Sequence, residues 1–337
     1  MNIYDANGYL NFDKISTINV PFVLIVGARA IGKTYGALRH EIESGEIFAL
    51  MRRTQNQIDM VRRPEFSPFK PITEDTGIDV WLKPISKNNS AIYTGTEEAP
   101  KLRGYTLALS TIANLRGFSG QDIKTLIYDE FIPEPHERPM PGEPAAFLNA
   151  YETINRNREL QGRPPLKMYC LANSNNVDNA AFEALGLTEK AIQMLKRGQE
   201  FYLNRDRGVC LIMPQRSPIS AKKAGTALYK VAASRNFTDM ALDNEFSNND
   251  FSQVRSMSLA GYKPLAATSD FYVYAHKTNN TYYVTSVKND AEFFDLATDP
   301  GRENYKLSFG WLYWEYVAKT LTFESYDLKS LFLKQYT

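Results

Sequence analysis

The chain has 337 residues, a length that favours two domains, one of them large enough to bury a wide sheet. Its hydrophobic fraction of 43% and charged fraction of 23% are ordinary for a folded globular protein and exclude a disordered or collagen-like chain. The formal net charge of +1 excludes a strong overall field for nucleic acid. No run approaches the roughly 18 apolar residues of a membrane span, so we expect no membrane association.

The first elements along the chain predict a parallel sheet. Pro21 to Val26 (PFVLIV) is a short, continuous apolar run, which is typical of a strand buried on both faces. Apolar residues at helical spacing follow from Lys33 to a stop at Gly45, and Glu46 to Arg53 (EIFALMRR) predicts a second strand. Strand, helix, strand is the repeating unit of a parallel sheet.

The next stretch widens this sheet. Residues 105–111, 124–131 and 166–173 predict three further strands, so the sheet has at least five. Within residues 64–104, IDVWLKP and SAIYTG predict a β-hairpin inserted outside the sheet. The proline-rich residues 133–144 predict an exposed loop before a helix at 145–159.

The composition changes after Pro214, and this change predicts the domain boundaries. Residues 1–214 form an α/β domain with a mainly parallel sheet flanked by helices, and residues 215–260 read as a polar helical linker. Residues 261–337 predict a small α+β domain, with two strands about the turn Asn279–Asn280 and an aromatic-rich helix in WLYWEYVAK.

A phosphate-binding loop (P-loop, Walker A) is the clearest chemical signal. GARAIGKT matches GxxxxGK[ST] in full and lies between a predicted strand and a predicted helix. In such a loop consecutive backbone N–H groups face the β-phosphate of a nucleotide. Lys33 would reach the β- and γ-phosphates of ATP, and the Thr34 hydroxyl would bind Mg²⁺. The predicted nucleotide-binding residues are Gly27, Ala28, Arg29, Ala30, Ile31, Gly32, Lys33 and Thr34.

Two adjacent carboxylates supply the second half of a hydrolytic site. Asp129 and Glu130 end the apolar run TLIYDE, and the carboxyl ends of parallel strands are where ligands bind in α/β sheets. Asp129 would hold the Mg²⁺ shell through water, and Glu130 would be the base that polarises the attacking water. Two acids at a strand end are common by themselves, and their pairing with the upstream P-loop favours the catalytic interpretation.

The long interval between Thr34 and Asp129 leaves room for further strands, so the P-loop strand and the Asp129 strand need not be adjacent. This arrangement is similar to the ASCE division of P-loop ATPases. Asn173, at the end of the following strand, could bond the water near the γ-phosphate. It could equally cap the turn that follows.

Three arginines are candidates for action across a subunit interface. Arg116 precedes the Asp129 strand, and Arg156 and Arg158 end the helix after it, so all three could reach a subunit edge. An arginine supplied to the γ-phosphate raises the hydrolysis rate by several orders of magnitude, although most surface arginines are merely solvated.

GARAIGKT, ALMRRTQ, LALSTIANLRGFSG, TLIYDEF and CLANSNN, in this order, resemble the DNA-packaging ATPases (encapsidation proteins) of small tailed phages related to phi29. More distantly they resemble the large terminase subunits. The resemblance covers Pro21 to Pro214 and is thin beyond. It implies a homo-oligomeric ring, a pentamer, that sits on the prohead portal in the host cytoplasm and pumps double-stranded DNA with ATP and Mg²⁺. In some relatives a packaging RNA is a further partner.

The resemblance also implies roles for individual residues. Arg53, at the end of the second strand, would lie near the nucleotide. Arg116, with Arg156 or Arg158, would act in trans on a neighbour's ATP. The C-terminal domain would be a degenerate RNase H-type nuclease, and because FYVYAHK contains no acid we expect it not to cut DNA. Residues 64–104, as an insertion free to face a central channel, are the candidate DNA grip.

Two other classes of function stay open from the sequence. One is a different ASCE motor, such as a helicase-like ATPase, although separate helicase motifs are absent from the chain. The other is a non-catalytic nucleotide-binding ring component. Glu130 argues against the latter, because a protein that only binds nucleotide needs no base beside the metal-binding Asp129.

Overall fold

The computed structural model describes residues 2–115, 120–134, 137, 140–174, 176–215, 217–228 and 253–336. The chain divides into two compact units, one of residues 1–187 and 191–248 and the other of residues 188–190 and 249–337. Helix α8 (Pro218–Ala224), at the start of the predicted linker, belongs to the first unit. None of the described helices is long and apolar enough to cross a membrane.

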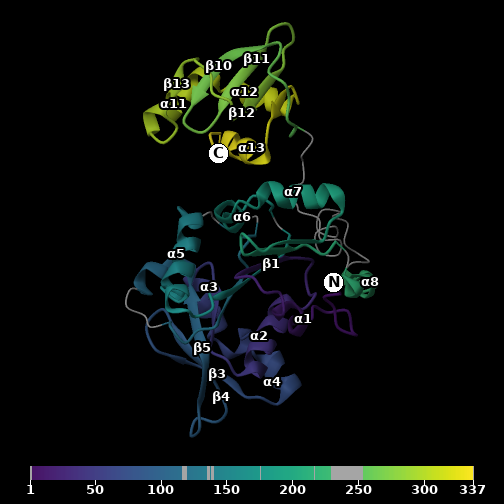
Figure 1. Ribbon diagram of the computed structural model, residues 1–337, viewed down its shortest axis with the longest axis vertical. Helices are drawn as coiled ribbons and strands as arrows, with labels where there is room; N and C mark the ends of the chain where they lie inside the picture. The colour runs from purple at the N-terminus through teal and green to yellow at the C-terminus, as the bar shows by residue number, and fades with distance from the viewer. Residues whose placement is uncertain are drawn as a thin grey trace. The chain divides into compact units, whose positions relative to one another are not determined.

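The first unit is built on one nine-stranded sheet with helices on both faces (Figure 1). Its strands are β1 (Phe22–Val26), β2 (Phe48–Arg52), β3 (Val80–Pro84), β4 (Ser90–Thr94), β5 (Lys101–Ala108), β6 (Thr125–Asp129), β7 (Lys167–Ala172), β8 (Phe201–Asn204) and β9 (Val209–Ile212). The helices accompanying the sheet are α1 (Phe12–Ser16), α2 (Lys33–Ser44), α3 (Gln55–Val61), η1 (Pro64–Phe66), α4 (Lys70–Thr76), η2 (Leu109–Leu115), α5 (Glu143–Asn155), η3 (Glu159–Gln161), α6 (Ala180–Leu185) and α7 (Thr188–Arg197).

The strand order is β3-β4-β5-β2-β6-β7-β1-β9-β8. The six strands from β5 to β9 in this order are parallel, and β3, β4 and β8 are antiparallel additions at the edges. Strand β7 lies between β1, which leads into the P-loop, and β6, which ends at Asp129. The predicted mainly parallel sheet is therefore confirmed, and the two strands, which the sequence did not require to be adjacent, are separated by β7.

Alternating side chains on β1 explain why both faces are covered. Val23 and Ile25 pack with Leu38 of α2 in the larger apolar core. Phe22 points the other way, and its ring lies 6.4 Å from that of Phe147 in α5. Because strand side chains alternate between faces, a continuous apolar strand must be covered on both, and α1, α2 and α4 lie opposite α5 (Figure 1).

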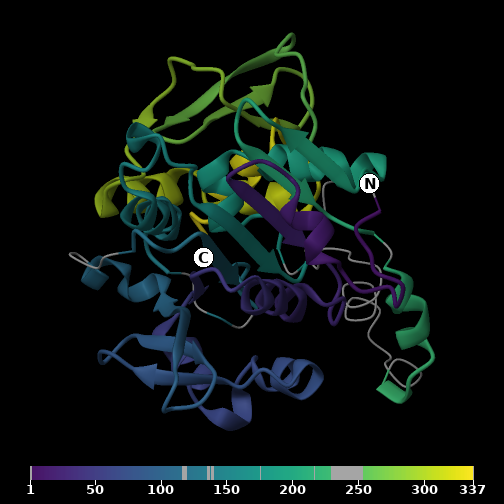
Figure 2. The ribbon, with the colours of Figure 1, turned by 60° about the horizontal axis from the view of Figure 1, so that its bottom comes forward.

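The predicted hairpin exists, but its predicted position outside the sheet is wrong. Strands β3 and β4 pair with each other, and β4 also pairs with β5, so the hairpin extends the sheet at the edge far from β1 (Figure 2). Pairing with β4 satisfies the backbone N–H and C=O groups along the outer side of β5, and β3 becomes the edge strand. The sequence also left β8 and α4 unpredicted.

The second unit is a small α+β fold, as predicted. Its five-stranded sheet has the order β13-β10-β11-β12-β14. The strands are β10 (Tyr262–Thr268), β11 (Tyr272–His276), β12 (Tyr282–Thr285), β13 (Phe293–Phe294) and β14 (Leu321–Phe323). The helices α11 (Asp299–Phe309), α12 (Leu312–Val317) and α13 (Tyr326–Leu333) contribute to a core around Phe271, Tyr305 and Phe332.

Candidate nucleotide site

The P-loop folds as a strand-to-helix turn between β1 and α2. Gly32 caps the helix with a φ of +87°, a left-handed conformation that residues with a side chain rarely adopt. Helix α2 begins at Lys33, whose residue is only 8% exposed. The Lys33 ammonium donates hydrogen bonds to the carbonyl oxygens of Gly27 (2.8 Å) and Ala28 (2.7 Å). The loop therefore surrounds a positive charge at a helix N-terminus, where phosphates bind.

Thr34 and Asp129 meet at the carboxyl edge of the sheet. The Thr34 hydroxyl donates a hydrogen bond of 2.8 Å to Oδ1 of Asp129, which is 2% exposed. Burial raises the pKa of Asp129, and the positive charge of Arg52 opposes this effect. A hydroxyl beside a carboxylate offers two hard oxygen ligands, the type that Mg²⁺ takes together with the phosphates of a nucleotide. These two residues fit the predicted metal role.

Arg52, at the end of β2, binds both carboxylates of the site. Its guanidinium lies 2.8 Å from Oδ2 of Asp129 and forms a second ion pair with Glu130. The Glu130 side chain is 52% exposed, and its backbone has a φ of +57°. A positive φ is uncommon for a non-glycine residue and is often found at functional sites. The turn at Glu130 thus places its carboxylate at the open side of the pocket.

The expectation that Arg53 lies near the nucleotide is corrected by the structure. Arg53 is 1% exposed, and its guanidinium donates two hydrogen bonds, of 2.6 and 2.8 Å, to the carboxylate of Glu143 at the start of α5. A third, of 3.1 Å, goes to Glu137. Successive residues of a strand point to opposite faces, so only one of the two arginines can face Asp129. That residue is Arg52, and Arg53 instead ties β2 to α5.

A pocket of about 200 Å³ lies over these residues. Its lining includes Asn173 as well as the P-loop and both carboxylates. The Asn173 side-chain oxygen accepts a hydrogen bond of 3.1 Å from the Lys33 ammonium. Strand β7, which lies between β1 and β6, is thus followed by an amide side chain that contacts the P-loop lysine and lines the same pocket as both carboxylates.

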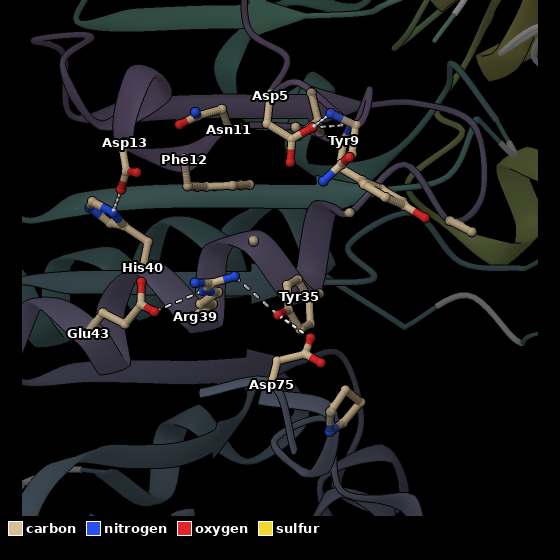
Figure 3. A pocket seen from close by; sticks show the side chains of 16 residues that line it. Asp5, Tyr9, Asn11, Phe12, Asp13, Tyr35, Arg39, His40, Glu43 and Asp75 are labelled. Atoms are coloured by element: carbon tan, nitrogen blue, oxygen red, sulfur yellow. Dashed lines mark hydrogen bonds and ion pairs between the residues drawn. The ribbon is translucent and has the colours of Figure 1, made fainter. Parts of the chain in front are cut away.

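A larger adjacent cavity, of about 660 Å³, was not predicted from the sequence. Figure 3 shows Asp5, Tyr9 and Phe12 of the N-terminal segment on one side of it and Tyr35 with Arg39 of α2 on the other. Ala30, Gly32 and Tyr35 line both this cavity and the smaller pocket. The Tyr35 hydroxyl donates a 2.6 Å hydrogen bond to Asp75 of α4. The N-terminal residues that line this cavity form no recognisable short motif, so their position beside the P-loop could not be predicted from the sequence.

The three candidate trans-acting arginines have different surroundings. Arg116 lies outside the described residues. Arg158 is 4% exposed, and its guanidinium donates to the carbonyl oxygens of Gly120 (3.0 Å), Gln121 (3.1 Å) and Ile123. A side chain held this way stabilises the turn before β6 and is not available to a neighbouring subunit. Of the described pair, only Arg156 is exposed.

The P-loop, the carboxylate pair on β6 and the strand between them define a P-loop ATPase fold of the ASCE division. The family model described as Podovirus DNA encapsidation protein (Gp16) matches residues 4–308. The chain therefore belongs to the Podovirus DNA encapsidation protein family.

Individual relatives agree with this assignment. The chain is 26% identical to the DNA packaging protein of Bacillus phage B103 over 247 residues, which span 71% of this chain and 67% of that protein. It is 24% identical to the DNA packaging protein of Bacillus phage phi29 over 248 residues, 72% of this chain and 65% of the relative. The aligned part thus spans about two thirds of these relatives.

Solved structures show the same fold. The bacteriophage Phi-29 viral genome packaging motor assembly contains a chain that matches with a TM-score of 0.66 and 18% identity, covering 97% of this chain and 98% of that one. The Phi-28 gp11 DNA packaging motor matches with a TM-score of 0.60 and 18% identity, covering 95% of both chains.

Proposed function

We propose that this protein hydrolyses ATP and uses the free energy to move double-stranded viral DNA into a preformed prohead. The observation that carries the proposal is the hydrogen bond between Thr34 and Asp129, because it joins the P-loop to the carboxylate pair across the intervening strand. Family membership supplies the substrate class. The match to encapsidation proteins does not favour a helicase-like ATPase or a non-catalytic ring component.

Each residue at the site has a distinct task in hydrolysis. Mg²⁺ bound with ATP would neutralise phosphate charge, with Thr34 and Asp129 as its protein ligands. Lys33 would exchange the carbonyls of Gly27 and Ala28 for phosphate oxygens. Glu130 would take a proton from the attacking water. Arg52 now occupies the carboxylate oxygens that the metal and the water need, so its guanidinium has to shift when nucleotide binds.

The larger cavity in Figure 3 is the proposed location of the base and ribose. It shares P-loop residues with the phosphate pocket, and a nucleotide bound at Lys33 would extend into it. Tyr9 and Tyr35 provide aromatic surface there, which suits a base.

The proposed working state is a homo-oligomeric ring, a pentamer, on the portal of the prohead in the host cytoplasm, with a packaging RNA as a further partner. The presence of matching chains in packaging motor assemblies supports an assembled state. A single subunit leaves its γ-phosphate open to water, where charge stabilisation is weak. A neighbour that closes this side would supply Arg156 and exclude solvent.

Arg156 and Arg158 should respond differently to alanine substitution. We expect Arg156→Ala to lower turnover by about 10³-fold, the magnitude of a lost arginine finger, while nucleotide affinity and thermal stability stay near wild type. Arg158→Ala should instead lower the melting temperature, because it leaves the carbonyls of Gly120 and Gln121 without their buried donor. Steady-state ATPase assays and thermal unfolding separate the two. Normal turnover in assembled Arg156→Ala would remove this residue from the proposal.

The proposed function is tested by measuring ATPase rate with and without double-stranded DNA, alone and with proheads. Stimulation by DNA together with proheads, and packaging of DNA into a nuclease-protected form, is the expected result. Neither β10 nor β11 contains an acidic residue, so the DNA should also be recovered uncut in Mg²⁺ or Mn²⁺. An ATPase rate that is the same with and without DNA and proheads would contradict the proposal of a packaging motor.

A further inference from the structure

Lys223 of α8 lies against the P-loop, and no sequence motif assigns it a role. Its ammonium donates a hydrogen bond of 2.6 Å to the carbonyl oxygen of Arg29. Lys33 is bonded to the carbonyls of Gly27 and Ala28, so three successive carbonyls of the loop accept from two lysines. Lys33 belongs to α2, the helix that follows the loop. Lys223 belongs to α8 and lies 194 residues after Arg29 in the sequence.

Helix α8 is fixed in this place by contacts at its start. The Ser217 hydroxyl caps the helix at Ile219 and also donates to the carbonyl oxygen of Gly8 at 3.3 Å. Gly8 has a φ of +93°, and a Cβ there would lie 2.8 Å from the Cβ of Pro218. Ile219 is buried in the core of the first unit. The approach of Lys223 to the loop is therefore set by packing at the base of α8.

The Arg29 side chain contacts the segment that follows the catalytic carboxylates. The Arg29 guanidinium lies 2.6 Å from Oε1 of Glu134, four residues after Glu130. Glu130 is the residue that would meet the water that attacks the γ-phosphate. The loop residue that accepts from Lys223 is therefore also tied to the segment that follows Glu130, whereas the backbone N–H groups of the loop serve the β-phosphate.

The positive charges around the loop oppose one another. The pKa of Lys33 is lowered to about 7, chiefly by burial; the charge of Asp129 opposes this effect, and the nearby charges of Lys223 and Arg29 add to it. An anion bound among these groups would relieve their mutual repulsion. Lysine has a flexible stem with rotatable donors, so its ammonium can move from a carbonyl to a phosphate oxygen.

From this geometry we propose that Lys223 is a second phosphate-binding lysine. When ATP binds, the Lys223 ammonium would break its hydrogen bond to the Arg29 carbonyl and bond to the γ-phosphate instead. The inference rests on the proposed function, because it assumes that the P-loop binds ATP. Its consequence is a direct link between the γ-phosphate and helix α8. Loss of the γ-phosphate would return Lys223 to the loop.

The test measures the affinities of the full-length protein for Mg²⁺ with AMP-PNP and with ADP. Lys223→Ala should raise the Kd for AMP-PNP about tenfold, the usual effect of losing one charged hydrogen bond, and that for ADP less than about threefold. Lys222→Ala is the matched control, since Lys222 is exposed on the same helix, and should change neither. Lys223→Arg should restore much of the preference for AMP-PNP.

Two outcomes would overturn the inference alone. Equal rises in both Kd values would mean that Lys223 only shapes the loop, and unchanged values would mean that it does not reach the phosphates. If Lys223→Ala unfolds, Lys223→Gln removes the charge with a polar side chain in its place and provides the same comparison. Failure of the wild type to bind either nucleotide would overturn the proposed function as well, so the two failures are distinguishable.

Discussion

Lys33→Ala should abolish ATP hydrolysis, with a loss of at least about 10³-fold, because the phosphates lose the ammonium at the centre of the loop. In the structure this group is almost fully buried and bonded to Gly27, Ala28 and Asn173. The measurement is steady-state ATPase activity together with nucleotide affinity, on protein whose circular dichroism matches the wild type.

The control for this variant is Lys222→Ala, which removes an exposed lysine of α8. It should hydrolyse ATP at the wild-type rate. Retained turnover in Lys33→Ala would show that the P-loop does not bind the transferred phosphate, and the assignment of an ATPase site at this position would then be wrong.

Glu130→Gln should bind ATP and fail to hydrolyse it. The amide keeps the shape of the side chain and removes the proton acceptor, for which general-base catalysis gives a loss of about 10²–10⁴-fold in turnover. The substitution also removes one of the two ion pairs that Arg52 forms with the described carboxylates and leaves the one with Asp129. Binding should therefore be retained or strengthened. Nucleotide affinity and single-turnover hydrolysis, measured on the same preparation, test both parts.

The matched control is Glu152→Gln, which changes an exposed carboxylate on α5 in the same way and should leave turnover unchanged. A Glu130→Gln protein without affinity for ATP would contradict the role of a base, because it would show that Glu130 is needed for binding itself.

Mixing Glu130→Gln with Arg156→Ala tests whether the arginine acts across an interface. Each variant alone should be nearly inactive, but mixed rings contain interfaces that join an intact Glu130 to an intact neighbouring Arg156. ATPase activity should then partly return. No recovery at any ratio, with mixed rings shown to form, would place Arg156 outside the site or within its own subunit.

Much of the fold could be predicted because its signals are local. A continuous apolar run such as Pro21 to Val26 predicts a strand buried on both faces, and the P-loop pattern needs only neighbouring glycines, a lysine and a hydroxyl. The turn between β11 and β12 likewise lies within a few residues of both strands. Strands interrupted by proline or lacking apolar length, such as β8 and β10, carry no comparable signal.

By itself, therefore, the sequence determined the chemistry at the carboxyl edge of the sheet: a P-loop, and Asp129 and Glu130 at the end of a strand. Tertiary structure decided which side chains surround that chemistry. It placed Arg52 at the carboxylates and Arg53 in a buried ion pair with Glu143, and it buried Arg158 beneath backbone carbonyls. It also brought Lys223 to the loop. Adjacent residues of a strand face opposite ways, so the sequence does not show which of Arg52 and Arg53 faces the carboxylates. Distant segments such as α8 and the P-loop meet only through packing, which no local sequence pattern encodes.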